Sequence, residues 1–169
     1  MDKRTPLDEI EANLVPIPEA LARRRYRRAD LRVDSALLAP LERFHQQMVE
    51  AGGSEDGQLV VNSCYRRRGT TCEEDYGGWI DRSDANGHWT GRSIDFSAAK
   101  TARSFFGKAT TLQHRDTVRI CLFRAGFRFP WYWKRKVGGR IKEHWHIGVE
   151  VDKWSQRRAY RENPPPWYS

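Results

Sequence analysis

The sequence predicts a single α+β domain in which a small antiparallel sheet is flanked by helices. Segments rich in β-branched and aromatic residues, which are typical of strands, alternate with segments whose apolar residues recur at helical spacing. A Gly-Gly pair at 138–139 lies between two strand-like segments and favours an antiparallel hairpin. A chain of 169 residues has the length of one domain and can bury a core without disulfides.

We expect three regions along the chain. Residues 1–33 form a basic N-terminal segment, and its arginine-rich run at 23–28 favours a charged surface element outside the core. The core domain covers 34–160. A Pro-rich tail, 161–169, follows it, because consecutive prolines favour a stiff extended chain.

The first helix of the domain is expected after Ser35, which can cap it, and the pair Gly52-Gly53 is expected to end it. Its apolar positions recur at helical spacing at Leu37, Leu38, Leu41, Phe44, Met48 and Val49. Residues 58–66 then read as a strand, because they are rich in β-branched residues. The polar stretch 67–87 is expected to be a long loop that could shape the mouth of a cleft.

A second strand is expected at 90–96, followed by helices at 97–106 and 112–125. Gly91 would let the backbone of this strand pass close to its neighbours. Gly126 follows the last apolar position of the second helix and predicts its C-cap.

The hairpin joined by the Gly-Gly pair is expected to consist of strands at 127–134 and 141–151. No apolar run approaches the ~20 residues that a membrane span needs. The first ten residues lack an apolar signal region, so we expect synthesis in the cytoplasm without a recognisable secretory signal.

The three cysteines, Cys64, Cys72 and Cys121, are an odd count without a C-x-x-C pair. This pattern disfavours a disulfide framework or a cysteine zinc site. We expect them to pack as small apolar groups, with a Cys64–Cys72 bridge as the alternative.

The residues with the clearest chemical pattern are His88 and Asp95, seven positions apart, and the cluster Glu143-His144-Trp145-His146 that follows about fifty residues later. Two imidazoles and a carboxylate are ligands that suit Zn²⁺. Three protein ligands leave the fourth tetrahedral position for water, whose pKa zinc lowers to about 7. A carboxylate near the last ligand could accept the water proton, so the pattern predicts hydrolysis of a carbonyl compound.

These residues carry a resemblance to the zinc D-Ala-D-Ala metallopeptidases, whose pattern is S-x-Y-R, then S-x-H-x-x-G-x-A-x-D, then E-x-W-H. The chain offers Ser63-Cys64-Tyr65-Arg66, then 86–95, then Glu143 to His146, in the same order. The family includes vancomycin-resistance carboxypeptidases and dipeptidases and phage L-alanyl-D-glutamate endopeptidases (endolysins), within the lysostaphin, D-Ala-D-Ala peptidase and hedgehog superfamily. The likeness covers about residues 59–151, but Asn86 and Ser93 replace the usual Ser and Ala, and a glycine pair is missing after Phe129.

The resemblance implies a hedgehog-like fold and one zinc ion per chain, held by His88, Asp95 and His146. Glu143 would be the general base, and Arg66 would stabilise the oxyanion, since a guanidinium presents fixed charged donors. Substrate-binding positions implied by the same motifs are Ser63, Tyr65, Asn86 and His144. The implied substrate is a peptidoglycan stem peptide with D-amino acids, cut at D-Ala-D-Ala or at L-Ala-D-Glu.

Glu143 has a rival in His144, because alternating side chains place His144 on the same strand face as His146. The H-x-H pair could supply two ligands, or one ligand and a catalytic histidine as in lysostaphin-like relatives. We prefer Glu143 as the base, since we expect the strand to be only beginning there. Trp145, on the opposite face, is expected in the core.

The formal charge of +8 and pI of about 9.7 indicate an anionic partner surface. This favours a wall-bound substrate and contacts with anionic cell-wall polymers, so the protein is expected to act at the cell wall after release. The main alternative is a non-catalytic, zinc-stabilised module that binds wall peptides or another polyanion. Nucleic acid is disfavoured, because no recognition-helix, OB or zinc-finger pattern accompanies the charge.

Overall fold

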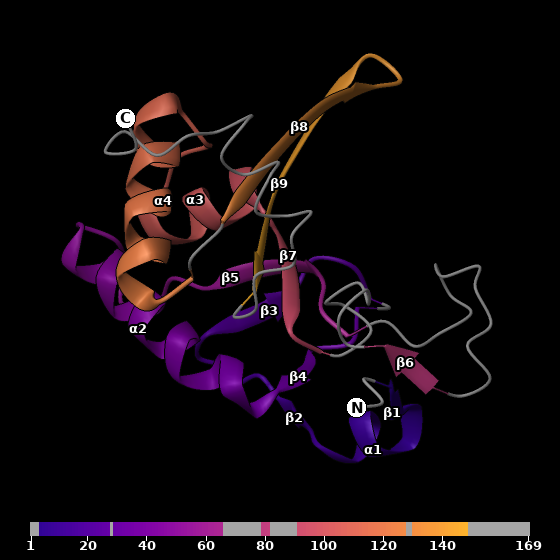
Figure 1. Cartoon of the computed structure of the whole chain (residues 1–169). Helices are drawn as coiled ribbons and strands as arrows, with labels where there is room; N and C mark the ends of the chain where they lie inside the picture. Colours follow the sequence, from indigo (N-terminus) through magenta and orange to yellow (C-terminus); the bar gives the residue numbers. More distant parts are fainter. Residues whose placement is uncertain (1–3, 28, 66–78, 82–90, 128–129, 149–169) are drawn as a thin grey trace, which may run out of the picture.

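The computed structural model describes residues 4–27, 29–65, 79–81, 91–127 and 130–148. They form a compact α+β unit in which helices lie along one side of a five-stranded sheet (Figure 1). The predicted fold class is confirmed. Within this part of the chain, no helix is long and apolar enough to cross a membrane.

The sheet has the strand order β3-β5-β7-β9-β8. Its strands are Ala22–Arg24, Leu59–Ser63, Ser93–Ser97, Arg140–Gly148 and Trp131–Val137, in that order. Strand β3 is parallel to β5, and the other neighbouring strands are antiparallel. The sheet is therefore mixed, whereas the sequence analysis predicted an antiparallel sheet. The parallel pair needs a long crossover, and the chain supplies it through the first long helix.

Three helices pack on one side of this sheet: α2 (Leu38–Glu50), α3 (Ala98–Phe106) and α4 (Leu112–Ala125). A 3₁₀ turn, Ser35–Leu37, precedes α2 and is capped by Asp34 and not by the predicted Ser35, since the Asp34 carboxylate accepts from the Ala36 N–H. Asp and Ser are comparable capping residues, so Asp34 is the cap because the turn begins at Ser35, one residue earlier than predicted. The predicted bounds of α4 are confirmed.

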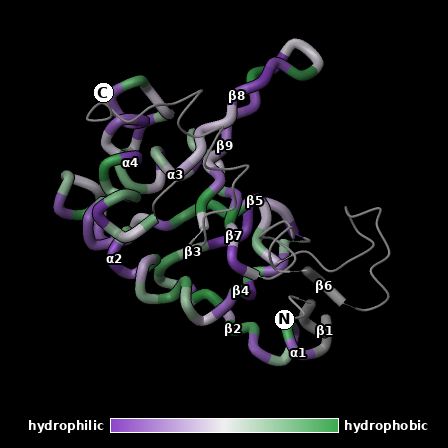
Figure 2. The backbone as a smooth tube through the Cα atoms, in the orientation of Figure 1, coloured by the Kyte–Doolittle hydropathy of each residue, from purple (hydrophilic) through white to green (hydrophobic). Residues whose placement is uncertain are grey.

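The hydrophobic core lies between the helices and the sheet, where Figure 2 shows hydrophobic colour on β5 and on the facing parts of the helices. Alternate residues of each strand point into it, as the period of two requires. Its fully buried members include Leu37, Leu41, Phe44, Met48, Val61, Ile94, Phe96, Leu122, Trp145 and Ile147. Four of the apolar positions predicted for α2 are among them.

The N-terminal segment is built into the fold. Strands β2 (Leu14–Pro16) and β4 (Arg32–Asp34) pair with each other, and β3 joins the main sheet. Ile17, Leu21, Ala22 and Val33 are buried in the core. The expectation that the core begins only after residue 33 is therefore wrong, because short apolar stretches around the arginine run contribute to it. The predicted tail, 161–169, lies outside the described residues.

The remaining described elements are β1 (Arg4–Pro6), α1 (Leu7–Ala12) and β6 (Trp79–Asp81), and β1 pairs with β6. The stretch predicted as a long loop, 67–87, thus contains a short strand. The predicted Gly138-Gly139 turn of the β8–β9 hairpin is confirmed, since both glycines have positive φ, 55° and 76°, as a type I′ turn requires.

Candidate functional site

Strand β9 presents two chemically different faces. Its ladder with β7 pairs Asp95 with His146 and Ser97 with His144, and its ladder with β8 pairs Trp131 with His146. Because directly paired residues point to the same side of a sheet, these side chains share the face away from the helices. We call this surface the histidine face and define it by Asp95, Trp131, Trp133, His144 and His146.

Asp95 and His146 form the centre of the histidine face. The imidazole Nδ1 of His146 lies 2.7 Å from Oδ1 of Asp95, which is hydrogen-bond distance. Asp95 is buried and His146 is half-buried. A buried carboxylate needs a partner of this kind, because an uncompensated charge in such a place is costly. The sequence predicted both as metal ligands, and the structure brings them together.

His144 lies beside this pair. Its ring stacks on Trp133 with 4.7 Å between centroids, and its edge faces Trp131 at 6.5 Å. Trp131 also contacts the His146 ring, at 6.3 Å. The two tryptophans therefore fix both histidine rings. Sequence reasoning missed this role, although the W-x-W spacing at the start of β8 places both indoles on one face.

Glu143 lies on the other side of the sheet. Paired with Lys134 inside the continuous β8–β9 ladder, it shares the helix-facing side with Tyr132 and Trp145. Its Oε1 is 4.0 Å from Lys134 Nζ, and Oε2 is buried. Burial, followed by the neighbouring Glu143 carboxylate, raises the pKa of Tyr132 above its ordinary value. The expectation that the strand only begins at Glu143 is wrong, since β9 begins at Arg140 and alternation already holds.

Helix α4 backs this part of the sheet with two arginines. The Arg115 guanidinium lies over the Tyr132 ring at 5.0 Å, and that of Arg119 lies over the Trp145 indole at 5.7 Å. Arg119 is buried, which lowers the pKa of its guanidinium, while Asp116 opposes this shift. Trp145 is 1% exposed, so its predicted place in the core is confirmed.

The residues of the S-x-Y-R motif are placed differently from one another. Ser63 ends β5 and pairs with Asp95 across a register shift, so it borders the histidine face. Tyr65 is buried, and its hydroxyl donates to Oε1 of Glu11 at 2.9 Å. The predicted roles of Arg66, Asn86 and His88 concern positions outside the described residues.

The donors on the histidine face fit part of a zinc site. Ligand atoms of one tetrahedral zinc ion, each about 2.0–2.1 Å from the metal, lie roughly 3.3 Å apart. Oδ1 of Asp95 and Nδ1 of His146, 2.7 Å apart, need only a small adjustment to meet that spacing. Among the described residues no cluster of three or more potential ligands occurs, and the expected third ligand, His88, is not one of these residues.

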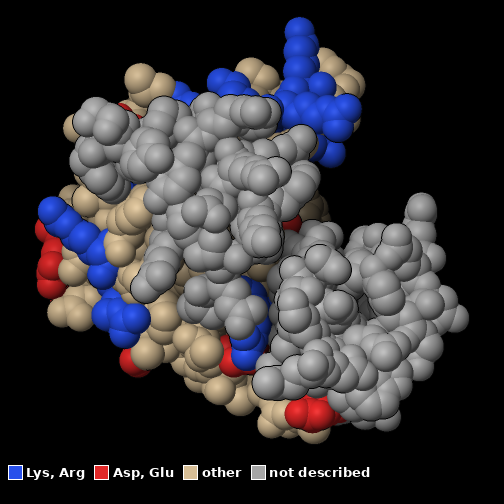
Figure 3. Space-filling view, viewed as in Figure 1, with Lys and Arg blue, Asp and Glu red and all other residues tan. Residues whose placement is uncertain are grey.

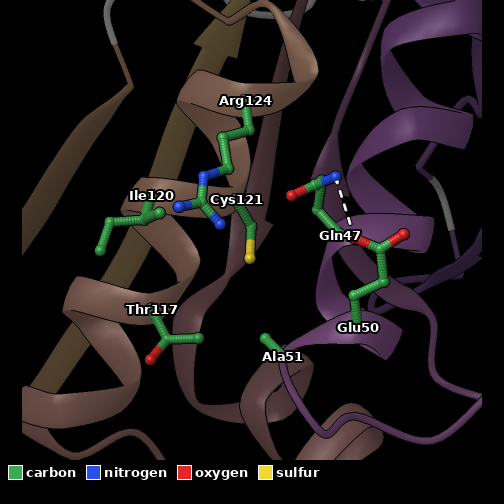
Figure 4. A pocket seen from close by; sticks show the side chains of 7 residues that line it. All are labelled: Gln47, Glu50, Ala51, Thr117, Ile120, Cys121 and Arg124. Atoms are coloured by element: carbon green, nitrogen blue, oxygen red, sulfur yellow. Dashed lines mark hydrogen bonds between the residues drawn. The ribbon is translucent and has the colours of Figure 1, made fainter.

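A cavity of about 380 Å³ lies on the helix side of the molecule, between α2 and α4 (Figure 4). Gln47 and Glu50 line one wall, where their side chains are hydrogen-bonded at 3.3 Å, and Cys121 and Arg124 line the other. Burial raises the pKa of the Cys121 thiol to about 11, so it is no nucleophile at neutral pH. Cys64 is buried as predicted, and Cys72 lies outside the described residues.

Comparisons of the chain with protein-family models, with curated proteins and with solved structures give no match.

Proposed function

We propose that the protein is a zinc-dependent peptidase that hydrolyses peptidoglycan stem peptides containing D-amino acids. The observation that carries the proposal is the 2.7 Å contact between Asp95 and His146 on the histidine face. These residues are two of the three ligands that the motif order implies, and they come from strands 51 positions apart in sequence. His88 is assigned as the third ligand by the motif alone.

Zinc at this site would supply a Lewis acid and a water molecule of lowered pKa. Asp95 and His146 would hold the ion through a carboxylate oxygen and an imidazole nitrogen. The strand geometry favours His144 over Glu143 as the proton acceptor, because His144 lies on the face of the ligands while Glu143 lies behind the sheet. Stacking on Trp133 would keep the His144 ring oriented. Arg66 retains the oxyanion role that the resemblance implies.

The substrate class rests on the motifs and on charge. A polyanionic wall concentrates a cationic enzyme, and the chain carries a formal charge of +8. The masses of the released fragments distinguish cleavage at a terminal D-Ala-D-Ala bond from cleavage at an internal L-Ala-D-Glu bond.

The experiment is digestion of purified peptidoglycan, with mass spectrometry of the released fragments and a zinc determination on each protein. The variants are Asp95→Asn, His144→Ala and Glu143→Gln. We expect Asp95→Asn to lose zinc and cleavage together. His144→Ala should keep zinc and lose about 10²- to 10⁴-fold in rate, the range of general acid–base catalysis. Glu143→Gln should keep both.

Two other outcomes have clear meanings. If Glu143→Gln keeps zinc but loses cleavage while His144→Ala stays active, the base is Glu143, and β9 must rearrange when substrate binds. If the wild-type protein holds zinc and cleaves no wall peptide, the peptidase proposal fails, and a zinc-stabilised module that binds wall peptides takes its place.

A further inference from the structure

The β8–β9 hairpin extends beyond the rest of the sheet as a two-stranded arm. Residues 144–146 of β9 pair with both β7 and β8, and residues 147–148 pair with β7, whereas 140–143 pair only with β8. The arm, which we define as residues 134–142, projects from the body of the molecule (Figure 1). All nine of its residues are exposed, so it contributes nothing to the core.

The arm concentrates positive charge. Five of its nine residues are basic, and none is acidic: Lys134, Arg135, Lys136, Arg140 and Lys142. Figure 3 shows Lys and Arg atoms gathered on this projecting end. Within the described residues, the structure records an ion pair of the arm only at Lys134, with Glu143 at 4.0 Å.

One cross-strand pair makes the charge costly for folding. Arg135 is directly opposite Lys142 in the ladder, and like charges in such a pair repel each other. A neutral or opposite pair would stabilise the hairpin better. The repulsion would be relieved by an anion bound beside both side chains, which points to an external anionic partner.

Exposed aliphatic side chains lie at the end of the same arm. Val137 is 40% exposed and Ile141 is 61% exposed, on either side of the Gly138-Gly139 turn. Figure 2 colours the arm mainly hydrophilic, with hydrophobic colour next to the turn. By alternation Val137 points to the side of the histidine face and Ile141 to the opposite side.

Charge and aliphatic residues therefore occur on both sides of the arm. Arg135, Arg140 and Lys142 share one side, and Lys134 and Lys136 share the other. A polymer bound along one face would need cations on that face only, and it would gain nothing from Val137 or Ile141. If the tip of the arm enters a bilayer surface, both sides of the arm contact lipid at once. Anionic headgroups then surround the cations, and the aliphatic tip reaches a less polar zone.

We propose that the β8–β9 arm is a peripheral membrane-binding element that docks on bilayers rich in anionic lipid. Its cations contact lipid phosphates, and Val137 and Ile141 enter the interfacial layer. This docking is independent of the peptidase proposal, because none of the arm residues belongs to the zinc site.

The test is sedimentation of the full-length protein with vesicles of phosphatidylcholine alone and with vesicles that also contain phosphatidylglycerol. We expect partition onto the anionic vesicles only, weakened by salt. Arg135→Gln with Lys142→Gln should weaken partition about 30-fold, since each cation near an anionic surface strengthens binding about fivefold. Val137→Ser with Ile141→Ser should weaken it roughly tenfold, from lost apolar transfer at unchanged charge.

Matched controls lie elsewhere on the surface. Lys100→Gln with Lys108→Gln removes two exposed cations outside the arm, and Leu112→Ser removes an aliphatic side chain that is 68% exposed. Neither should change partition more than about twofold. Circular dichroism verifies that each variant is folded. If a double variant does not fold, the single variant Arg135→Gln or Ile141→Ser is measured in its place.

Three results would overturn the proposal. The first is a wild-type protein that does not partition onto anionic vesicles. The second is an equal loss in the arm variants and the control variants, which would mean diffuse charge attraction. The third is vesicle binding that Val137→Ser with Ile141→Ser does not weaken, together with equally strong binding of the protein to soluble polyphosphate. This result would make the arm a polyanion-binding surface.

Discussion

Asp95 and His146 are fixed opposite each other by the residues that flank them on the other side of the sheet. Ile94, Phe96 and Trp145 are all buried against the helices. A slip of one residue in the β7–β9 register would turn this apolar set outward and the carboxylate and imidazole inward. The core therefore enforces the 2.7 Å contact between Oδ1 and Nδ1 on the opposite face.

The first prediction concerns metal affinity. Asp95→Asn removes the negative charge of the carboxylate that we propose as a zinc ligand. We expect the zinc affinity to fall by at least about 100-fold, since even outer-shell partners of a zinc site are worth about 10- to 100-fold. Isothermal titration with zinc chloride measures it. The control variant is Asp56→Asn, at an exposed position far from β7 in sequence, and it should bind zinc with the affinity of the wild type. Equal affinity in all three proteins would exclude Asp95 as a ligand.

Local signals in the sequence were sufficient for helix α4 and for the hairpin turn. The bounds of α4 follow from apolar spacing and from Gly126, whose positive φ ends the helix. The Gly138-Gly139 turn is similarly local. Trp145 could be assigned to the core because alternation along one strand needs no knowledge of its neighbours.

Long-range pairing could not be read in the same way. Strand β3 is only Ala22–Arg24, and its two arginines indicate a surface run, whereas its parallel partner β5 lies some 37 residues further on. The face of Glu143 depended on where β9 begins. A strand start at 141, as predicted, left open whether side chains already alternate at Glu143, and only the ladder with β8 shows that the backbone is extended from Arg140 onward.

The second prediction uses two glycines with nearly equal φ, 71° for Gly91 and 72° for Gly107. A Cβ at Gly91 would overlap Leu14 Cδ2 and lie 3.0 Å from the Asp34 nitrogen, whereas a Cβ at Gly107 would have nothing within 4 Å. We expect Gly107→Ala to cost about 1 kcal/mol from backbone strain alone, and Gly91→Ala about 2–4 kcal/mol. Urea unfolding monitored by circular dichroism measures both. Equal costs would mean that the chain around Leu14 yields without penalty.

The third prediction separates structure from catalysis at Tyr132. Its hydroxyl is buried next to Glu143, so Tyr132→Phe leaves that carboxylate with less compensation. We expect a loss of about 1–2 kcal/mol in the free energy of unfolding. Zinc content and peptidoglycan cleavage should stay at the wild-type level, because Tyr132 and Glu143 lie behind the sheet. A variant of normal stability with impaired cleavage would instead place Tyr132 in the site.

The fourth prediction concerns the pH dependence of stability at Cys121. Burial raises the pKa of this thiol from 9.0 to about 11 in the folded protein. Above pH 9 the unfolded chain loses the proton first and the folded chain keeps it, so the unfolded state is favoured as the pH rises. The contribution is constant below about pH 9 and declines from there to about pH 11.

Cys121→Ala removes this titration, although it also leaves a small void in the core. The difference in unfolding free energy between wild type and variant cancels the other groups that titrate in the same range, including Tyr132 and Cys64. We expect the wild type to lose about 1–3 kcal/mol relative to the variant between pH 9 and pH 11. Urea unfolding at several pH values measures the difference. Parallel curves for the two proteins would show that the thiol reaches solvent in the folded state.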